Sequence, residues 1–231
     1  MKIIILHVYI KFMKKIIFVL LVIILISGCK PQKFFSGNKD YFSQNKLDYL
    51  KYKNPNLTYE WDFNETINNG GGKTYRKDYF HIKKYNLIDK LTTYLLPYLV
   101  IFKHEEGHIF AWNLWNFSKI DNFDTFIYDP KCKKKFGETS RNYSIIISEG
   151  TSEYYAIKYF DNFNLSLGKE YFSYSRDNRH YNDQYWKNYI GYLFVNHTIS
   201  RGEYKDLNEF ILNWCTEKQY NLFQEFIKSL T

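Results

Sequence analysis

The sequence predicts an α+β fold that is mostly helical, with a small antiparallel sheet near its start. Before residue 84, apolar and polar residues alternate in two short stretches, as they do in β-strands. After Asn86 the apolar residues recur every three or four positions, as they do on one face of an α-helix. Strands that come before a series of helices are typical of the α+β class.

The first residues have the organisation of an export signal. Two lysines precede an apolar run, Ile16 to Ile26, and small residues follow it. Its eleven residues are too few to cross a bilayer core of about 30 Å at about 1.5 Å per residue. We therefore expect residues 1–28 to be a signal peptide, with Met13 as a candidate start of translation in place of Met1.

The end of the apolar run, Ile26-Ser27-Gly28-Cys29, resembles the lipobox of bacterial lipoproteins. This resemblance implies that Cys29 carries a lipid and begins the mature chain. It also implies a location in the bacterial cell envelope, anchored to a membrane with the folded domain outside the cytoplasm. Residues 29–46 are then a polar tether and residues 47–231 the folded domain. The alternative is an ordinary cysteine after a cleaved signal.

The charge of the chain argues against a nucleic-acid-binding role. The 231 residues include 32 Lys and Arg against 24 Asp and Glu, and four of the lysines precede residue 29. Elsewhere the one dense basic tract is short, at Lys131 to Lys135. We therefore interpret the surplus as a solvated surface and expect no nucleic acid among the partners.

Two strands are predicted before the helices. Leu57 to Phe63 alternates and is rich in residues that favour strands. The triple glycine Gly70 to Gly72 marks a turn or a flexible loop. Lys73 to Lys83 alternates around Tyr79 to Ile82, so we expect it to be the antiparallel partner strand.

Helices are predicted over the rest of the chain. Helical spacing begins at Leu87, and Pro97 kinks this segment or separates it from the next helix, Leu99 to Phe117. Later helical stretches are predicted at Ser144 to Phe160, at Tyr185 to Ser200 and, in two pieces, at Asp206 to Leu230.

A His-Glu-x-x-His motif lies inside the helix predicted from Leu99 to Phe117. His104 and His108 are four residues apart, so both imidazoles project from one helix face. This separation lets both rings reach a single Zn²⁺ at about 2.0–2.1 Å. Glu105 lies to the side of the metal, where its carboxylate can take a proton from zinc-bound water.

A third ligand is expected from a later helix, because catalytic zinc normally has three protein ligands. Glu149 and Glu153 are four residues apart and share a helix face. One of these carboxylates can bind the metal while the other holds a ligating histidine by a hydrogen bond. Forty residues separate His108 from Glu149, so an excursion around residues 121–142 must be accommodated.

The segments His104-Glu105-Glu106-Gly107-His108 and Glu149-Gly150-Thr151-Ser152-Glu153-Tyr154 together resemble the motifs of gluzincins, in particular the aminopeptidase-like branch of the zincin-like metallopeptidases. This resemblance implies a zincin-like domain that hydrolyses peptide bonds. It also implies the role of each residue: zinc ligands at His104, His108 and Glu149, a general base at Glu105, and a supporting carboxylate at Glu153.

The same resemblance implies a tyrosine that stabilises the negative charge of the transition state. Tyr189, which lies two residues before Gly191, is the first candidate, with Tyr185 second and His180 third. The alternative for each tyrosine is a packing or surface role, since aromatic side chains commonly fill cores and interfaces.

Two functions and two states of the cysteines stay open from the sequence alone. The first function is a membrane-tethered zinc peptidase acting on peptides or proteins. The alternative is a non-catalytic lipoprotein that binds partners or has a structural role, its motif lapsed or fortuitous; Trp112 and Trp115 fit a recognition surface equally well. Cys132 and Cys215 either form a disulfide in an oxidising compartment or stay as two thiols.

Overall fold

The described part of the chain begins at residue 39. The computed structural model describes residues 39–64, 72–76, 78–85, 97–115, 132, 135–137, 140–163, 165–178 and 183–230. They belong to one unit, Phe35–Thr231. Several predicted features lie outside the described residues: the signal peptide, Cys29, the helical stretch from Leu87 up to Pro97 and most of the excursion at 121–142.

Two short 3₁₀ helices and a three-stranded sheet come first. The helices are η1 (Lys39–Phe42) and η2 (Lys46–Tyr52). The strands are β1 (Glu60–Asn64), β2 (Gly72–Arg76) and β3 (Tyr79–Lys83), in the spatial order β1-β3-β2. β2 pairs with β3 in antiparallel fashion, whereas β1 runs parallel to β3 and places Trp61 opposite Phe80.

The prediction of an antiparallel sheet is therefore wrong for one of its two pairings. The stretch from Lys73 to Lys83 holds two strands instead of one. The short connection between them makes β2 and β3 antiparallel. Because the chain runs back along β2 before it enters β3, β3 points in the same direction as β1.

Six helices follow in the described chain: α3 (Tyr98–Leu114), α6 (Ser140–Asn162), α7 (Leu167–Asn178), α8 (Asp183–Ser200), α9 (Leu207–Leu212) and α10 (Glu217–Ser229). The predicted helices from Leu99 onward are confirmed, with ends shifted by a few residues. α7 is not among the predicted helices, because its buried side chains include Tyr171, Tyr174 and Ser175 in place of an aliphatic stripe.

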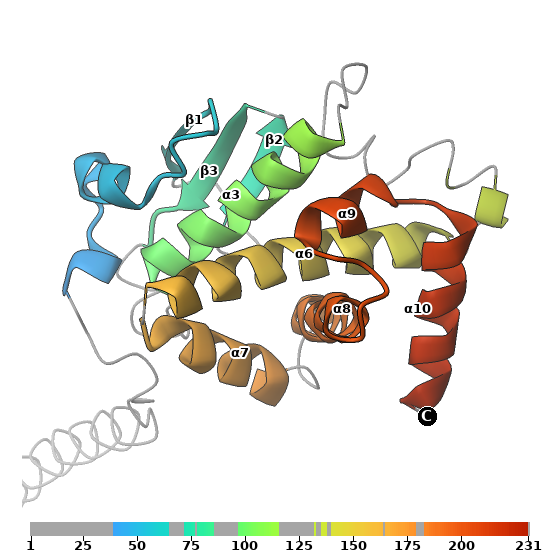
Figure 1. Cartoon of the computed structure of the whole chain (residues 1–231). Helices are drawn as coiled ribbons and strands as arrows, with labels where there is room; N and C mark the ends of the chain where they lie inside the picture. Colours follow the sequence, from blue (N-terminus) through green and yellow to red (C-terminus); the bar gives the residue numbers. More distant parts are fainter. Residues whose placement is uncertain are drawn as a thin grey trace, which may run out of the picture. The chain divides into compact units, whose positions relative to one another are not determined.

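The helices are stacked on the sheet in layers. α3 lies between the sheet and α6, and α6 lies between α3 and the pair α7 and α8 (Figure 1). Because α3 is covered on both sides, its residues from Tyr98 to Ile109 are all buried. This helix carries the His-Glu-x-x-His motif.

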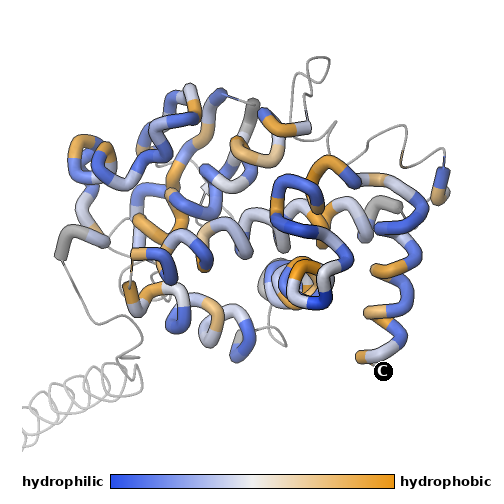
Figure 2. Tube along the Cα trace, viewed as in Figure 1, coloured by the Kyte–Doolittle hydropathy of each residue, from blue (hydrophilic) through white to orange (hydrophobic). Residues whose placement is uncertain are grey.

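Two apolar clusters hold the layers together. The first core joins the sheet to the start of α3, the end of α6 and α7, and includes Trp61, Phe102 and Phe160. The second core joins the end of α3 and the start of α6 to α8, α9 and α10, and includes Ile147 and Phe194. Along α10, hydrophobic and hydrophilic residues alternate as its apolar side faces the second core (Figure 2). α3 and α6 each run from one core to the other, in opposite directions.

A disulfide joins Cys132 to Cys215 within the second core, with their Cα atoms 5.3 Å apart. Of the two alternatives that the sequence left open, the structure thus contains the bridge. It links the chain just before α6 to the connection between α9 and α10.

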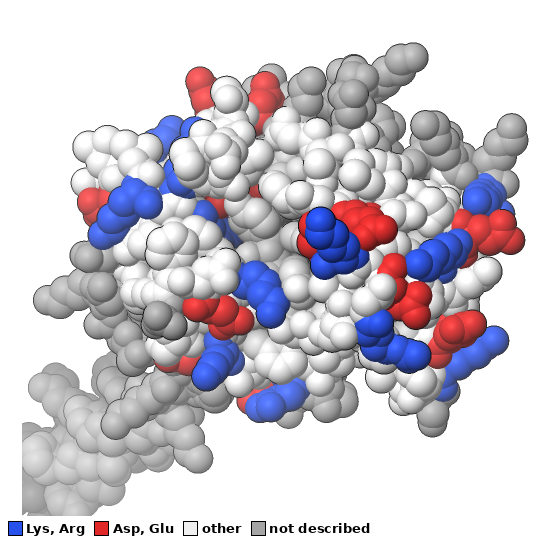
Figure 3. Space-filling view, in the orientation of Figure 1, with Lys and Arg blue, Asp and Glu red and all other residues white. Residues whose placement is uncertain are grey.

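The surface of the described chain is mixed in charge. On the face shown in Figure 3, basic and acidic side chains lie interspersed among larger uncharged areas. Of the helices that the structure describes, none combines the length and the apolar character needed to cross a membrane.

Glycines set the distances between the three central helices. A Cβ atom on Gly107 of α3 would lie 2.8 Å from the Cα atom of Ser152 in α6. A Cβ atom on Gly191 of α8 would lie 2.6 Å from the Cα atom of Gly150 in α6 and would clash with the carbonyl oxygen of Ile146. Larger residues would therefore push α6 away from its neighbours.

Replacing Gly191 by alanine should destabilise the fold. Alanine favours a helix interior by up to about 1 kcal/mol over glycine, but here its methyl group meets backbone atoms that cannot rotate away. We expect a net loss of about 1–3 kcal/mol in the free energy of unfolding, measured by urea denaturation. Gly168→Ala is the control, because the nearest atoms to its Cβ lie at 3.2 Å. An equal effect of both substitutions would refute this account.

Candidate metal centre

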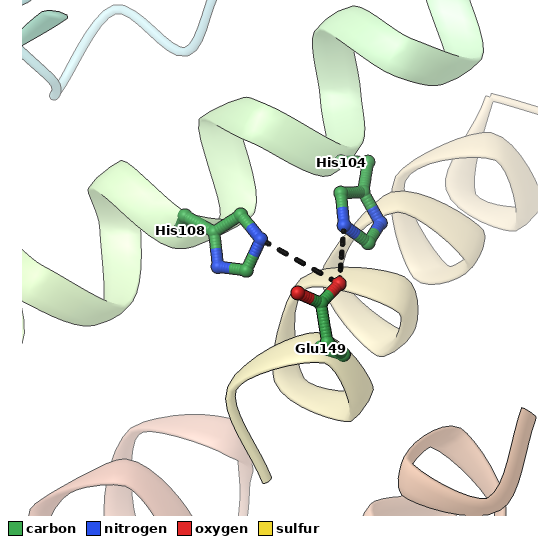
Figure 4. A group of neighbouring side chains, drawn as sticks. All are labelled: His104, His108 and Glu149. Atoms are coloured by element: carbon green, nitrogen blue, oxygen red, sulfur yellow. Dashed lines mark hydrogen bonds and ion pairs between the residues drawn. The ribbon is translucent and has the colours of Figure 1, made fainter. Parts of the chain in front are cut away.

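Three buried side chains from two helices converge on one point. His104 and His108 project from α3, and Glu149 projects toward them from α6 (Figure 4). Glu149 Oε2 lies 3.1 Å from His104 Nε2 and 3.9 Å from His108 Nε2. One ligand atom from each of the three residues lies within 4.8 Å of the other two. The predicted convergence of these residues is confirmed, and a metal ion can be held between them.

The donor atoms fit a divalent metal ion. In a tetrahedral site with bonds of 2.0–2.1 Å, neighbouring ligand atoms lie about 3.4 Å apart, a value between the 3.1 Å and 3.9 Å distances at Glu149. The Nδ1 atom of His104 lies 3.2 Å from Glu153 Oε2, and that of His108 lies 3.2 Å from Ser148 Oγ. Since each Nδ1 atom has this partner, both Nε2 atoms are left to face the shared point.

The surroundings shift the pKa values of the two histidines in opposite directions. Burial lowers the pKa of His108 to about 3, against the opposing charge of Glu149. Burial also acts to lower the pKa of His104, but the hydrogen bonds and charges of Glu149 and Glu153 outweigh it and raise that pKa well above 6.5. A neutral His108 is the form in which an imidazole binds a metal ion.

Glu105 is held from the other side of α3 by the edge strand of the sheet. Thr74 Oγ1 of β2 donates a hydrogen bond of 2.6 Å to Glu105 Oε2. A Cβ atom on Gly72 would lie 2.6 Å from Glu105 Oε1, so only glycine leaves room for the carboxylate there. Burial raises the pKa of Glu105 to about 7, although the charge of His104 and the hydrogen bond from Thr74 lower it. The carboxylate is therefore fixed in place against β2, near enough to His104 and Glu149 for their charges to affect its pKa.

A second buried network lies on α3 beside the metal centre. Glu106 forms an ion pair with Lys103, and neither side chain is exposed. Glu106 also accepts hydrogen bonds from Tyr59, from Tyr155 at 3.1 Å and from the backbone N–H of Asn54 at 2.7 Å. This carboxylate ties the segment before β1 and the helix α6 to the helix that carries the histidines.

The structure brings together five of the predicted site residues and leaves others untested. His104, His108 and Glu149 converge, and Glu153 contacts His104. Glu105 lies near enough to His104 and Glu149 for their charges to affect its pKa. Tyr189 lies on α8, where its half-buried ring is 5.5 Å from that of Phe172 in α7; its role as a charge-stabilising residue stays a prediction. The side chain of Tyr185, His180 and Cys29 lie outside the described residues.

Four residues that the sequence analysis did not select also contact the centre. Thr74 binds Glu105, and Ser148 contacts His108. Tyr171 and Ser175 of α7 contact His104 and Glu153. Ser148 directly precedes Glu149, a local signal that was available. The others approach the centre from β2 and α7, and no sequence pattern connects them to it.

Comparison with known proteins adds no family to this description. No protein-family model, no curated protein and no solved structure matches the chain. What is established is a mostly helical fold with a small mixed sheet and a buried group of two histidines and one glutamate that can hold a metal ion.

Replacing Glu106 by glutamine should destabilise the fold strongly, because the ammonium group of Lys103 then stays buried without a counter-charge. We expect a loss of about 3–5 kcal/mol in the free energy of unfolding, measured by urea denaturation. Glu225→Gln is the matched control, since Glu225 is exposed on α10. A Glu106 variant as stable as the control would show that this ion pair contributes little.

Proposed function

We propose that this protein is a zinc-dependent peptidase of the gluzincin type, tethered to a bacterial membrane and acting on peptides or proteins. The convergence of His104, His108 and Glu149 around one point carries the proposal. A histidine pair one turn apart on a helix with a carboxylate from a second helix is the donor set of many hydrolytic zinc sites. Glu105, which follows the first histidine, supplies the base that such a site needs.

Zinc bound by these three side chains would activate a water molecule and polarise the carbonyl group of the substrate. Glu105 would take a proton from the water molecule as the water oxygen bonds to the carbonyl carbon of the substrate. It would then pass this proton to the amide nitrogen as the C–N bond breaks. Thr74 supports this role because its hydrogen bond fixes one carboxylate oxygen of Glu105.

We also propose that the protein works outside the cytoplasm, anchored by a lipid at Cys29. The basic and apolar segment that ends in Ile26-Ser27-Gly28-Cys29 supports this location. The disulfide between Cys132 and Cys215 supports it independently, because such bridges persist in oxidising compartments. Intact-mass analysis of the mature protein from its native membrane tests the anchor, since a lipid on Cys29 adds a defined mass.

The base is tested by the substitution Glu105→Gln. The amide keeps the shape of the side chain and leaves all three metal ligands in place, but it cannot accept a proton from water. We expect zinc stoichiometry to stay near that of the unchanged protein, with hydrolysis of a peptide library reduced at least about 100-fold.

His104→Ala is the companion variant, because it should lose both zinc and hydrolysis. Substantial hydrolysis by the Glu105 variant would remove this residue from its role. If the unchanged protein binds zinc and cleaves no peptide in the library, it is instead a non-catalytic binding or structural lipoprotein.

The two carboxylates of α6 should differ in their effect on metal binding. Glu149 faces the Nε2 atoms of both histidines, whereas Glu153 lies beside Nδ1 of His104, on the side of the ring away from Nε2. We expect Glu149→Ala to weaken zinc binding more than Glu153→Ala, whose effect should be about 10- to 100-fold. Competition with a chromophoric chelator measures both affinities, and the reverse order would exchange the two roles.

A further inference from the structure

We propose that α7 is part of the metal centre and that Tyr171 and Ser175 are its positioning residues, acting through His104 and Glu153. The inference rests on the proposed metal site, but on no particular reaction. It assigns a role to a helix that carries none of the three ligands.

Both hydroxyl groups project from one face of α7 into the buried region behind His104. Tyr171 and Ser175 are four residues apart on this helix, and they are 3% and 0% exposed. Ser175 Oγ donates a hydrogen bond of 2.9 Å to Glu153 Oε1. The hydroxyl oxygen of Tyr171 lies 3.4 Å from His104 Nδ1.

The contacts form a chain from α7 to the metal-binding nitrogen. Ser175 holds one oxygen of Glu153, and the other oxygen lies 3.2 Å from His104 Nδ1. A carboxylate only accepts hydrogen bonds, so Glu153 keeps a proton on Nδ1 of His104 whether or not Nε2 also carries one. Nε2, which faces Glu149 and His108, is then the nitrogen that can exchange its proton for a metal ion.

Tyr171 limits the rotation of the imidazole ring of His104. Its hydroxyl group approaches the Nδ1 atom of His104 together with Glu153, so the N–H group has acceptors from two different helices. The ring of Tyr171 is packed in the first core, which fixes the position of the hydroxyl group. The imidazole is therefore held by packed elements on the side away from the metal position.

If these hydroxyl groups only stabilised the fold, their removal would have a different effect from the one that a positioning role predicts. Burying Glu153 without hydrogen-bond donors would be costly, so Ser175 could serve stability alone. In that case its removal lowers the stability of the metal-free protein and leaves the intrinsic zinc affinity unchanged. A positioning role instead requires a change in zinc affinity and in the geometry of the bound metal.

The experiment compares Ser175→Ala, Tyr171→Phe and the double variant with the control Ser173→Ala, a half-buried serine on the same helix. Zinc affinity is measured by competition with a chromophoric chelator, and ligand geometry by the visible absorption of Co²⁺ in the same site. Thermal unfolding of each metal-free variant shows which of them are folded at the temperature used. Tyr171→Phe keeps the ring, so it tests the proposal even if the serine variant folds poorly.

We expect Ser175→Ala to weaken zinc binding about 10-fold and to change the Co²⁺ spectrum. Tyr171→Phe should have a smaller effect in the same direction, because its contact is longer, and Ser173→Ala should have none. Unchanged zinc affinity and an unchanged spectrum in the folded Ser175 and Tyr171 variants would overturn the proposal.

These measurements separate this inference from the proposed function, since no substrate is involved. If Ser175→Ala weakens zinc binding while the unchanged protein cleaves no peptide, the positioning role stands and the peptidase function fails. If the unchanged protein is an active zinc peptidase and both variants bind zinc normally, the positioning role fails alone. A protein that binds neither zinc nor Co²⁺ overturns both.

Discussion

The burial of polar side chains in the middle of α3 is the constraint on which the rest of the structure depends. Five of its residues between 103 and 108 are polar or charged, and none is more than 8% exposed. A buried polar group without a partner costs about 1–3 kcal/mol, and a charged group costs more. Lys103 and Glu106 pair with each other within α3, and the other partners must come from elements packed against this helix. The partners come from β2, from the segment before β1 and from α6. The positions of these elements are set by hydrogen bonds and ion pairs as much as by apolar packing.

The two polar networks of α3 differ in what they hold: one joins parts of the chain, and the other can hold a metal ion. Around Glu106, four donors surround one carboxylate, so this network joins three parts of the chain and has no place for a metal ion. Around His104 and His108, donors and acceptors are paired at Nδ1, and the two Nε2 atoms and Glu149 face one another. Because the Nδ1 partners of both histidines are already in place, these two ligands are preorganised for a metal ion.

The part of the site that follows from helical periodicity could be predicted from the sequence, because that period is local. His104 and His108 are one turn apart, as are Glu149 and Glu153. The helix face that each pair shares could therefore be inferred without knowledge of the fold. The parallel pairing of β1 with β3 was not predictable in this way, since it depends on the turn between β2 and β3 that splits one apparent strand into two. Thr74 and Ser175 were missed for a related reason: each approaches the centre from a distant element, and a lone hydroxyl residue carries no pattern.

The long excursion between the two motifs is compatible with the site because the connection does not set the register of α3 and α6. The two helices run in opposite directions between the same two cores, so each has an apolar section in each core. Between these sections lie the polar residues, which must then face one another. The close approach of Gly107 to Ser152 fixes where the helices cross. Extending a connecting loop costs little, because the entropy of loop closure grows only with the logarithm of its length. Forty intervening residues therefore leave His108 and Glu149 as close as a short connection would.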